Sequence, residues 1–141
     1  MNNLYIGLMS GTSRDSLDGC LVSFDDGLEI QKLATISFSK DYQSSNDQNF
    51  IAKEITRKSI TLVERLISNS NKENIIGIAF PGQTISHSDE FSLQAGSPEA
   101  IAKQFGLVNI IHAQLAMKVI VPSLTLNVSR ISGAKTFIAA V

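Results

Sequence analysis

The chain has 141 residues, of which 43% are hydrophobic and 18% charged, a composition that indicates one globular domain and argues against a disordered chain. Lys and Arg number 12 against 13 Asp and Glu, so the net charge of -1 excludes the basic surface of a nucleic-acid-binding protein. One cysteine and two histidines exclude an internal disulfide and a zinc cluster.

The sequence also bears on localisation. No run approaches the roughly 20 apolar residues that span a bilayer, so we expect no membrane partner. Residues 1–9 lack the basic segment of a signal peptide, and the polar residues 10–13 interrupt the apolar run. We therefore expect a cytoplasmic protein.

The first 40 residues predict a three-stranded antiparallel meander. The apolar run 4–9 ends at the turn-forming residues 10–13, and a polar turn is expected over 14–18. Residues 20–24 and 29–37 predict two further strands, joined by an Asp-Asp-Gly turn. In this pattern Cys20 is a packing residue of the second strand rather than a nucleophile.

Residues 41–69 divide into an aperiodic stretch and a stretch with helical periodicity. Residues 41–49 are polar and aperiodic, which predicts a loop. Between 50 and 69 the apolar residues recur at helical spacing, which predicts a long helix with a charged outer face and a Glu54–Lys58 pair on that face. The positions expected to face the core are Ile51, Ile55, Ser59, Leu62, Val63, Leu66 and Ile67.

The remaining elements complete an α/β pattern. Residues 75–80 predict a buried strand that closes a strand-helix-strand crossover. Ser97 as N-cap, Pro98 in the first turn and Gly106 as the stop predict a helix, and residues 107–111 predict a strand. The order β-β-β-α-β-α-β over residues 4–111 indicates an α/β fold with a mixed sheet.

Residues 10–18 carry the clearest chemical signal. A glycine among small hydroxyl residues lets N–H and O–H groups point into one concavity, which suits a phosphate. Asp15 and Asp18 offer carboxylates for a divalent cation. The same residue types also form ordinary hairpin turns, and the Gly-Lys-Ser/Thr ending of a P-loop is missing.

Three segments occur together in a fixed order: residues 5–13, residues 82–87 and residues 92–97. The set resembles the anhydro-N-acetylmuramic acid kinase family, whose members carry Met-Ser-Gly-Thr-Ser-x-Asp-Gly-x-Asp, His-Gly-Gln-Thr-x-x-His and Leu-Gln-x-Gly-Asp. The resemblance extends over residues 4 to about 111. It implies a ribonuclease-H-like lobe of the actin/Hsp70/sugar-kinase type. It also implies phosphoryl transfer from ATP with Mg²⁺ to 1,6-anhydro-N-acetylmuramic acid, with ring opening by water, in peptidoglycan recycling.

The resemblance assigns site residues position by position. The residues that it implies for ATP binding are Gly11, Thr12, Ser13, Arg14, Asp15, Ser16, Leu17 and Asp18, with Asp15 and Asp18 also holding the metal. Those that it implies for substrate binding are Gln83, Thr84 and His87. Ser16 replaces a glycine of the family, which would cost on the order of 1 kcal/mol if that residue needed a positive φ. Pro81 and Ser97 replace a histidine and an aspartate.

The resemblance fails after Ile111. The family continues into an Asp-Phe-Arg segment, whose aspartate activates the attacking water, and then into a glycine-rich segment, and this chain has neither. His112 lies near the vacated position and is a candidate replacement base, or a histidine bonded to backbone or solvent at a strand end. Because a positioned base contributes about 10²–10⁴-fold, we expect little or no catalysis by this chain.

The expected organisation is a kinase lobe at 1–111 and a divergent tail at 112–141, without the second lobe. In the tail, residues 126–133 faintly resemble a later family motif, Leu-Asn-Ile-Gly-Gly-Ile-Ser/Ala-Asn. The expected ligands are a nucleotide and an amino sugar. Without the second lobe, the apolar face that would pack against it is exposed. We therefore expect this face to bind a second copy of the chain, as a homo-oligomer, or a separately encoded second lobe. The alternatives are a non-catalytic nucleotide- or sugar-binding module, a decayed remnant, and an unrelated α/β domain.

Overall fold

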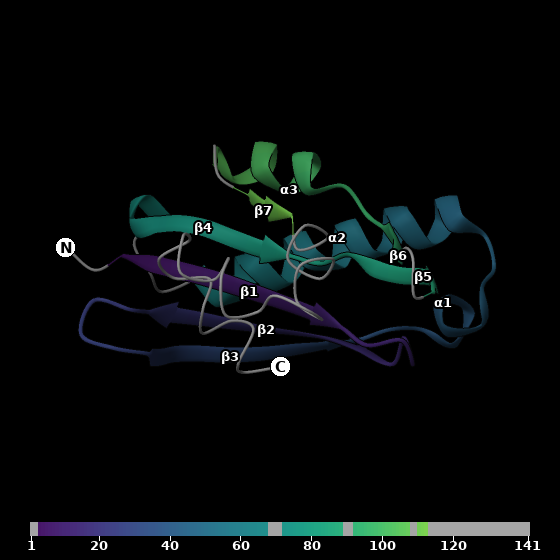
Figure 1. Ribbon diagram of the computed structural model, residues 1–141, viewed down its shortest axis with the longest axis horizontal. Helices are drawn as coiled ribbons and strands as arrows, with labels where there is room; N and C mark the ends of the chain where they lie inside the picture. The colour runs from purple at the N-terminus through teal and green to yellow at the C-terminus, as the bar shows by residue number, and fades with distance from the viewer. Residues whose placement is uncertain (1–2, 68–71, 89–91, 108–109, 113–141) are drawn as a thin grey trace.

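The computed structural model of the chain describes residues 3–67, 72–88, 92–107 and 110–112. The strands are β1 Leu4–Ser10, β2 Ser16–Ser23, β3 Glu29–Ser37, β4 Ile75–Phe80, β5 Gln83–His87, β6 Ser92–Ala95 and β7 Ile110–His112. The helices are α1 Lys40–Ser44, α2 Gln48–Ile67 and α3 Pro98–Phe105, with a 3-10 turn at Lys72–Asn74. Within these residues one sheet has the order β3-β2-β1-β4-β7, and β5 and β6 form a separate hairpin (Figure 1).

The main sheet is mixed, as predicted. β1 pairs antiparallel with β2, and β2 pairs antiparallel with β3, which confirms the meander. β4 lies parallel to both β1 and β7, which confirms the crossover through α2. Because β1, β4 and β7 run in the same direction, their C-terminal ends lie at one edge of the sheet (Figure 1).

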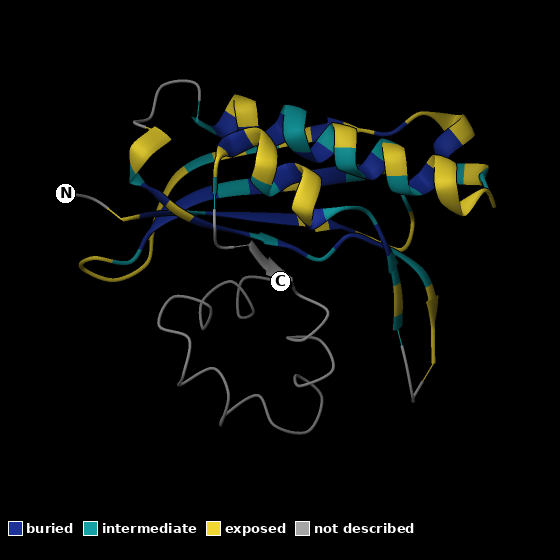
Figure 2. Ribbon diagram, turned by 90° about the horizontal axis from the view of Figure 1, so that it is seen from above, coloured by how far each residue is buried: buried dark blue, intermediate teal, exposed yellow. Residues whose placement is uncertain are grey.

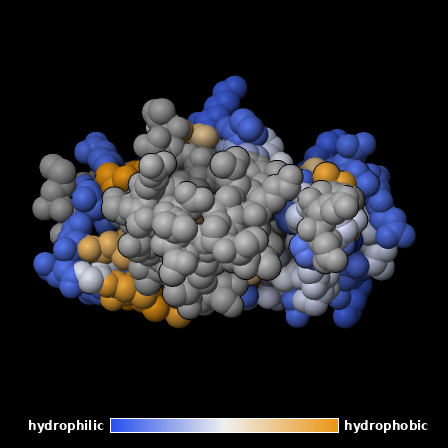
Figure 3. Space-filling view, in the orientation of Figure 1, coloured by the Kyte–Doolittle hydropathy of each residue, from blue (hydrophilic) through white to orange (hydrophobic). Residues whose placement is uncertain are grey.

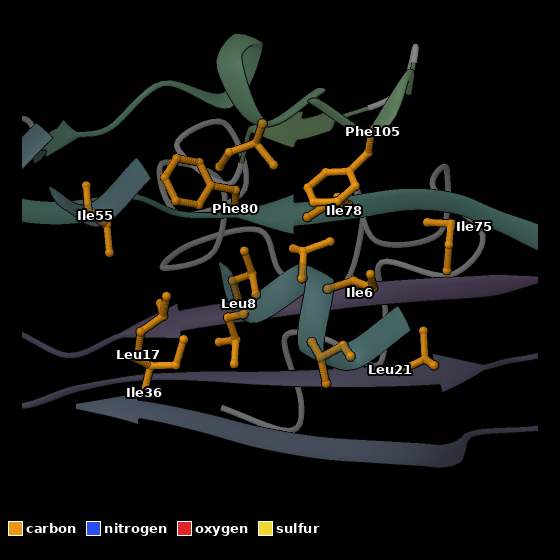
Figure 4. Close-up of a cluster of buried hydrophobic side chains, with 14 of the residues drawn as sticks. Ile6, Leu8, Leu17, Leu21, Ile36, Ile55, Ile75, Ile78, Phe80 and Phe105 are labelled. Carbon is orange, nitrogen blue, oxygen red and sulfur yellow. The ribbon is translucent and has the colours of Figure 1, made fainter. Parts of the chain in front are cut away.

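The core lies between the sheet and α2. Figure 2 shows the buried stripe of α2 against the sheet and its exposed side facing outward. The predicted core positions of this helix are buried, with Ile67 partly buried. Side chains from β1, β2, β3 and β4 fill the same layer; those labelled in Figure 4 include Ile6, Leu8, Leu17, Leu21, Ile36, Ile78 and Phe80.

Local signals determine the bounds of α3. The Ser97 side chain accepts a hydrogen bond from the Ala100 N–H at 3.2 Å, and Pro98 occupies the first turn. Gly106 ends the helix in the left-handed conformation with φ 65°. The predicted cap, first-turn proline and stop are therefore confirmed.

Three local predictions were wrong. Residues 41–49 are not a loop, because α1 buries Tyr42 completely and α2 begins at Gln48. The turn at 14–18 is shorter than expected, since β2 begins at Ser16. Glu54 pairs with Arg57 at 2.6 Å rather than with Lys58, whose amine donates to the Ser37 carbonyl.

The last predicted strand lies further along the chain than expected. β7 begins at Ile110, whereas the prediction covered residues 107–111, of which 108 and 109 fall outside the described residues. The expectations for residues 113–141, including the faint motif at 126–133, also fall outside them.

Exposed apolar side chains gather on the meander. Leu28 is 47% exposed, Ile30 56% and Leu33 69%, all in β3 or the turn that precedes it. Figure 3 shows an orange patch at the lower left, where Figure 1 places the end of the β2–β3 hairpin. None of the described helices has the length and apolarity needed to cross a bilayer.

Ser59 carries a buried hydroxyl whose removal should stabilise the fold. Its hydroxyl is fully buried in α2 and has no hydrogen-bond partner among the described residues. Because a buried, unsatisfied hydroxyl is costly, Ser59→Ala should raise the free energy of unfolding by about 1 kcal/mol in a urea titration. The control Thr56→Val should lower it, because the Thr56 hydroxyl accepts the Ser97 N–H at 2.9 Å. A loss of stability in Ser59→Ala would contradict the prediction.

Candidate functional site

Residues 11–15 form a tight loop between β1 and β2. The Arg14 N–H donates to the Gly11 carbonyl at 3.2 Å and closes a turn, and Arg14 has φ 56°, in the left-handed region. Gly11, Thr12 and Ser13 are exposed at the tip of this turn. The loop therefore presents to solvent three of the residues that the sequence analysis assigns to nucleotide binding.

The neighbouring elements hold the loop. The Arg14 guanidinium donates to the Ser45 carbonyl at 2.7 Å, at the C-cap of α1. The Phe38 N–H donates to the Asp15 carbonyl at 2.9 Å. Arg14 is thus an anchor of the loop, so its side chain is committed to the α1–α2 junction.

Asp15 and Asp18 carry the acidic groups of the candidate site. Oδ1 of Asp15 accepts from the Ser13 hydroxyl at 2.8 Å and from the Ser16 N–H at 2.9 Å. These bonds, that of Ser13 foremost, lower the pKa of Asp15, so the carboxylate is ionised at neutral pH. Oδ1 of Asp18 accepts from the Thr35 hydroxyl at 2.7 Å, and both aspartates are exposed.

This donor set suits a magnesium ion held together with a phosphate. Mg²⁺ keeps several waters and takes one or two protein carboxylates plus phosphate oxygens. The described residues contain no group of three or more His, Cys, Asp or Glu side chains that could enclose a metal. Asp15 and Asp18 are exposed carboxylates of the kind that an open magnesium site uses, and with the described residues they form no protein cage.

Ser16 and Leu17 lie in β2 rather than in the loop. Among the described residues other than glycine only Arg14 has a positive φ, so serine at position 16 carries no such strain. Leu17 is 1% exposed, and its side chain belongs to the core.

The second and third motifs form one hairpin, which sequence reasoning did not anticipate. Thr84 lies opposite Gln94 in the β5–β6 pair, and its hydroxyl donates to Gln94 Oε1 at 3.0 Å. Gln94 Nε2 donates to the Ser92 hydroxyl at 2.6 Å. His87 is exposed at the end of β5.

Gln83 joins this hairpin to the loop. Its side chain is fully buried, and Nε2 donates to the Gly11 carbonyl at 3.1 Å. Oε1 accepts from the Ser10 hydroxyl at 2.6 Å and from the Tyr42 hydroxyl at 3.2 Å. Sequence reasoning included Ser10 in the candidate phosphate segment 10–18 but assigned it no contact with Gln83, and no pattern singled out Tyr42.

His112 and Cys20 lie outside the loop and the hairpin. β7 ends at His112, which pairs in register with Phe80, so the backbone of His112 reaches the same edge of the sheet as the loop after β1. Cys20 lies partly buried in β2, and burial raises the pKa of its thiol. A raised pKa disfavours the reactive thiolate at neutral pH, in keeping with a packing role.

An antiparallel meander continued by parallel strands and covered by α2 defines an α/β lobe of the ribonuclease-H-like class. No family model matches the chain. The anhydro-N-acetylmuramic acid kinase of Shewanella pealeana is 33% identical over 125 residues, which covers 75% of this chain and 34% of that relative. That of Hydrogenovibrio crunogenus is 31% identical over 126 residues, and that of Pseudoalteromonas translucida 32% over 138.

The chain belongs to the anhydro-N-acetylmuramic acid kinase family. It spans about a third of the length of these curated relatives, 34% in each case.

Proposed function

We propose that this chain is the nucleotide-binding lobe of an ATP-dependent sugar kinase of peptidoglycan recycling. The substrate is 1,6-anhydro-N-acetylmuramic acid and the product N-acetylmuramic acid 6-phosphate. Of residues 11–18, the exposed Gly11, Thr12, Ser13 and Asp15 contact ATP, Asp15 and Asp18 hold Mg²⁺, and Thr84 and His87 face the sugar. The observation that supports the proposal is the Gln83–Gly11 bond of 3.1 Å, which brings residues of the first two family motifs into contact.

The chemistry sets the demands on these residues. Bound Mg²⁺ offsets charge on the phosphates as the γ-phosphoryl group passes to the O6 of the sugar. Water adds at C1 of the sugar and gives up a proton to a base, the C1–O6 bond of the anhydro bridge breaks, and the freed O6 takes the phosphoryl group as ADP leaves. Residues 112–141 contain no Asp or Glu, so this stretch offers His112 rather than a carboxylate as the base.

We therefore propose that this chain binds its ligands but catalyses phosphoryl transfer slowly or not at all. A non-catalytic binding module is accordingly a second candidate function. The lobe at 1–111 is the binding unit, and 112–141 is a divergent tail. A second lobe or a second copy would cover exposed apolar residues such as Ile30 and Leu33. A cytoplasmic location belongs to the same proposal.

Titration of the purified chain with Mg-ATP tests the nucleotide site. Asp15→Asn keeps an oxygen that accepts the Ser13 and Ser16 hydrogen bonds but removes the charge. We expect the affinity for Mg-ATP to fall at least about tenfold, because a charge-assisted contact is lost. Because hydrogen bonds lower the pKa of Asp15, its carboxylate stays ionised from pH 7 down to pH 5, so protonation of Asp15 should not weaken Mg-ATP binding in this range.

Asp26→Asn is the matched control, since it removes the same charge from the exposed turn between β2 and β3. Equal affinities of Asp15→Asn and wild type for Mg-ATP would contradict the proposed site. ADP release that depends on the added sugar would indicate a kinase with a replacement base, and the next variant would be His112→Asn. Binding of Mg-ATP without ADP release would favour the binding module.

A further inference from the structure

The side-chain amide of Gln83 is held in one orientation. Its oxygen faces the hydroxyls of Ser10 and Tyr42, and its nitrogen faces the carbonyls of Gly11 and Thr84, the latter at 3.4 Å. A flipped amide would place its oxygen against two carbonyl oxygens, neither of which can donate a hydrogen bond. The network therefore determines which end of the amide meets the loop.

The Gly11 carbonyl is the point at which this network meets the turn. It accepts the Arg14 N–H at 3.2 Å as well as Gln83 Nε2 at 3.1 Å. One carbonyl thus closes the turn of residues 11–14 and ties it to the first residue of β5. A shift of that carbonyl would move the exposed tip formed by Thr12 and Ser13.

We propose that Gln83 is a positioning residue, which fixes the Gly11 carbonyl and with it the conformation of the loop that meets the nucleotide. The inference rests on the proposed function for the identity of that ligand. A side chain with no exposed surface acts through the loop and does not touch a solvent-borne sugar, so this role differs from the substrate contact that the family resemblance implies. Sugar recognition is then left to exposed or partly exposed side chains of the hairpin, such as Thr84 and His87.

The side chains that bond to Gln83 include one titratable group, Tyr42. Ser10 approaches from β1 and Tyr42 from α1, and Tyr42 is the titratable group that bonds to the amide. Burial raises the pKa of Tyr42, so its hydroxyl remains a donor at neutral pH; the charges of Arg14 and Glu54 also act on it. The local donors therefore do not change between pH 5 and pH 7.5.

Gln83→Glu converts this role into a pH-dependent one. When protonated, the new carboxyl can donate to the Gly11 carbonyl, as the amide does. When ionised, it faces the two carbonyl oxygens in a buried site, so its pKa is raised above the ordinary value of about 4.3. A buried carboxyl with a raised pKa leaves the fold most stable at low pH. Its contribution to stability is lost as the pH rises from the ordinary pKa of the unfolded chain towards the raised pKa of the folded chain.

Hydrogen exchange of the Arg14 amide, corrected for its intrinsic rate, measures the position of the turn in the full-length chain without any ligand. In Gln83→Glu we expect protection of this amide to fall at least about tenfold at pH 7.5 and to recover to near the wild-type value at pH 5. Gln83→Met, which has no donor, should lose protection at both pH values.

Gln94→Glu is the matched control, because it makes the same change on β6, where Gln94 bonds to Thr84 and Ser92. It should leave Arg14 protection unchanged at both pH values. Wild-type protection in Gln83→Glu at pH 7.5, or a loss that pH 5 does not reverse, would overturn the proposal.

Tyr42→Phe keeps the experiment decisive if Gln83→Glu unfolds at pH 7.5. It removes one of the two hydroxyl groups that orient the amide while retaining the ring, and it should lower Arg14 protection about threefold. No change in Arg14 protection would overturn the inference. Mg-ATP affinity is measured in parallel: a wild-type chain that does not bind Mg-ATP would count against the proposed function alone, because the exchange result needs no nucleotide.

Discussion

Gly82→Ala is expected to lower the free energy of unfolding by about 3 kcal/mol, since a left-handed alanine costs about 1–2 kcal/mol and the steric overlap adds a similar amount. Gly82 has φ 75°, and a Cβ atom there would lie 2.5 Å from the Ala95 carbonyl oxygen. That oxygen belongs to the backbone of β6, so no side-chain rotation relieves the contact. Urea unfolding followed by circular dichroism measures the loss.

Gly106→Ala separates backbone strain from steric overlap. Gly106 has a similar φ of 65°, but a Cβ atom there would meet nothing within 4 Å. We expect this variant to lose about 1 kcal/mol, from backbone strain alone. Equal losses in the two variants would mean that the contact with Ala95 contributes nothing. Since Gly82 directly precedes Gln83, the Gly82→Ala variant should also reduce the protection of the Arg14 amide.

Leu62→Ala is the second substitution with a large expected effect, about 3 kcal/mol, because it opens a cavity between α2 and the sheet. Leu62 is fully buried, and its Cδ2 atom would lie 2.9 Å from a Cβ atom at Gly19 of β2. Gly19→Ala alone should therefore overpack this contact and cost about 1 kcal/mol.

The double variant tests whether the two positions are coupled. The methyl group of Gly19→Ala would enter the space vacated by Leu62→Ala, so the loss in the double variant should be smaller than the sum of the single losses. Additive losses in urea titrations of the four chains would show that Gly19 does not set the approach of α2. A matched pair away from this contact, Leu62→Ala with Gly27→Ala, should be additive.

Elements with local signals were predictable from the sequence. β4 was predicted with its observed bounds, since a short apolar run is enclosed by polar residues and the Pro81-Gly82 pair. The cap of α3 followed from Ser97, Pro98 and Gly106, whose effects reach no further than one helical turn.

α1 could not be predicted because its reason for forming is distant in the sequence. Its residues are polar and aperiodic, and its one buried side chain is Tyr42. That ring stacks on Phe38 at 4.1 Å and its hydroxyl reaches Gln83, 41 residues away. A helix of five residues gains little by itself, so these tertiary contacts decide its formation.

The sequence by itself determined the three family motifs, the candidate residues of the loop and the order of β1, β2, β3, α2, β4, α3 and β7, but neither α1 nor the β5–β6 hairpin. Tertiary structure alone decided that Gln83 lies buried beneath that loop and that Thr84 faces Gln94 across a hairpin. The physical reason is the parallel pairing of β1 with β4, which brings residues 11–15 and Gln83 to one edge of the sheet although more than 60 positions separate them. The local period of α2 predicts which face of the helix is buried, but it does not encode the strand register that places Gln83 beneath residues 11–15, because that register depends on contacts between residues far apart in the sequence.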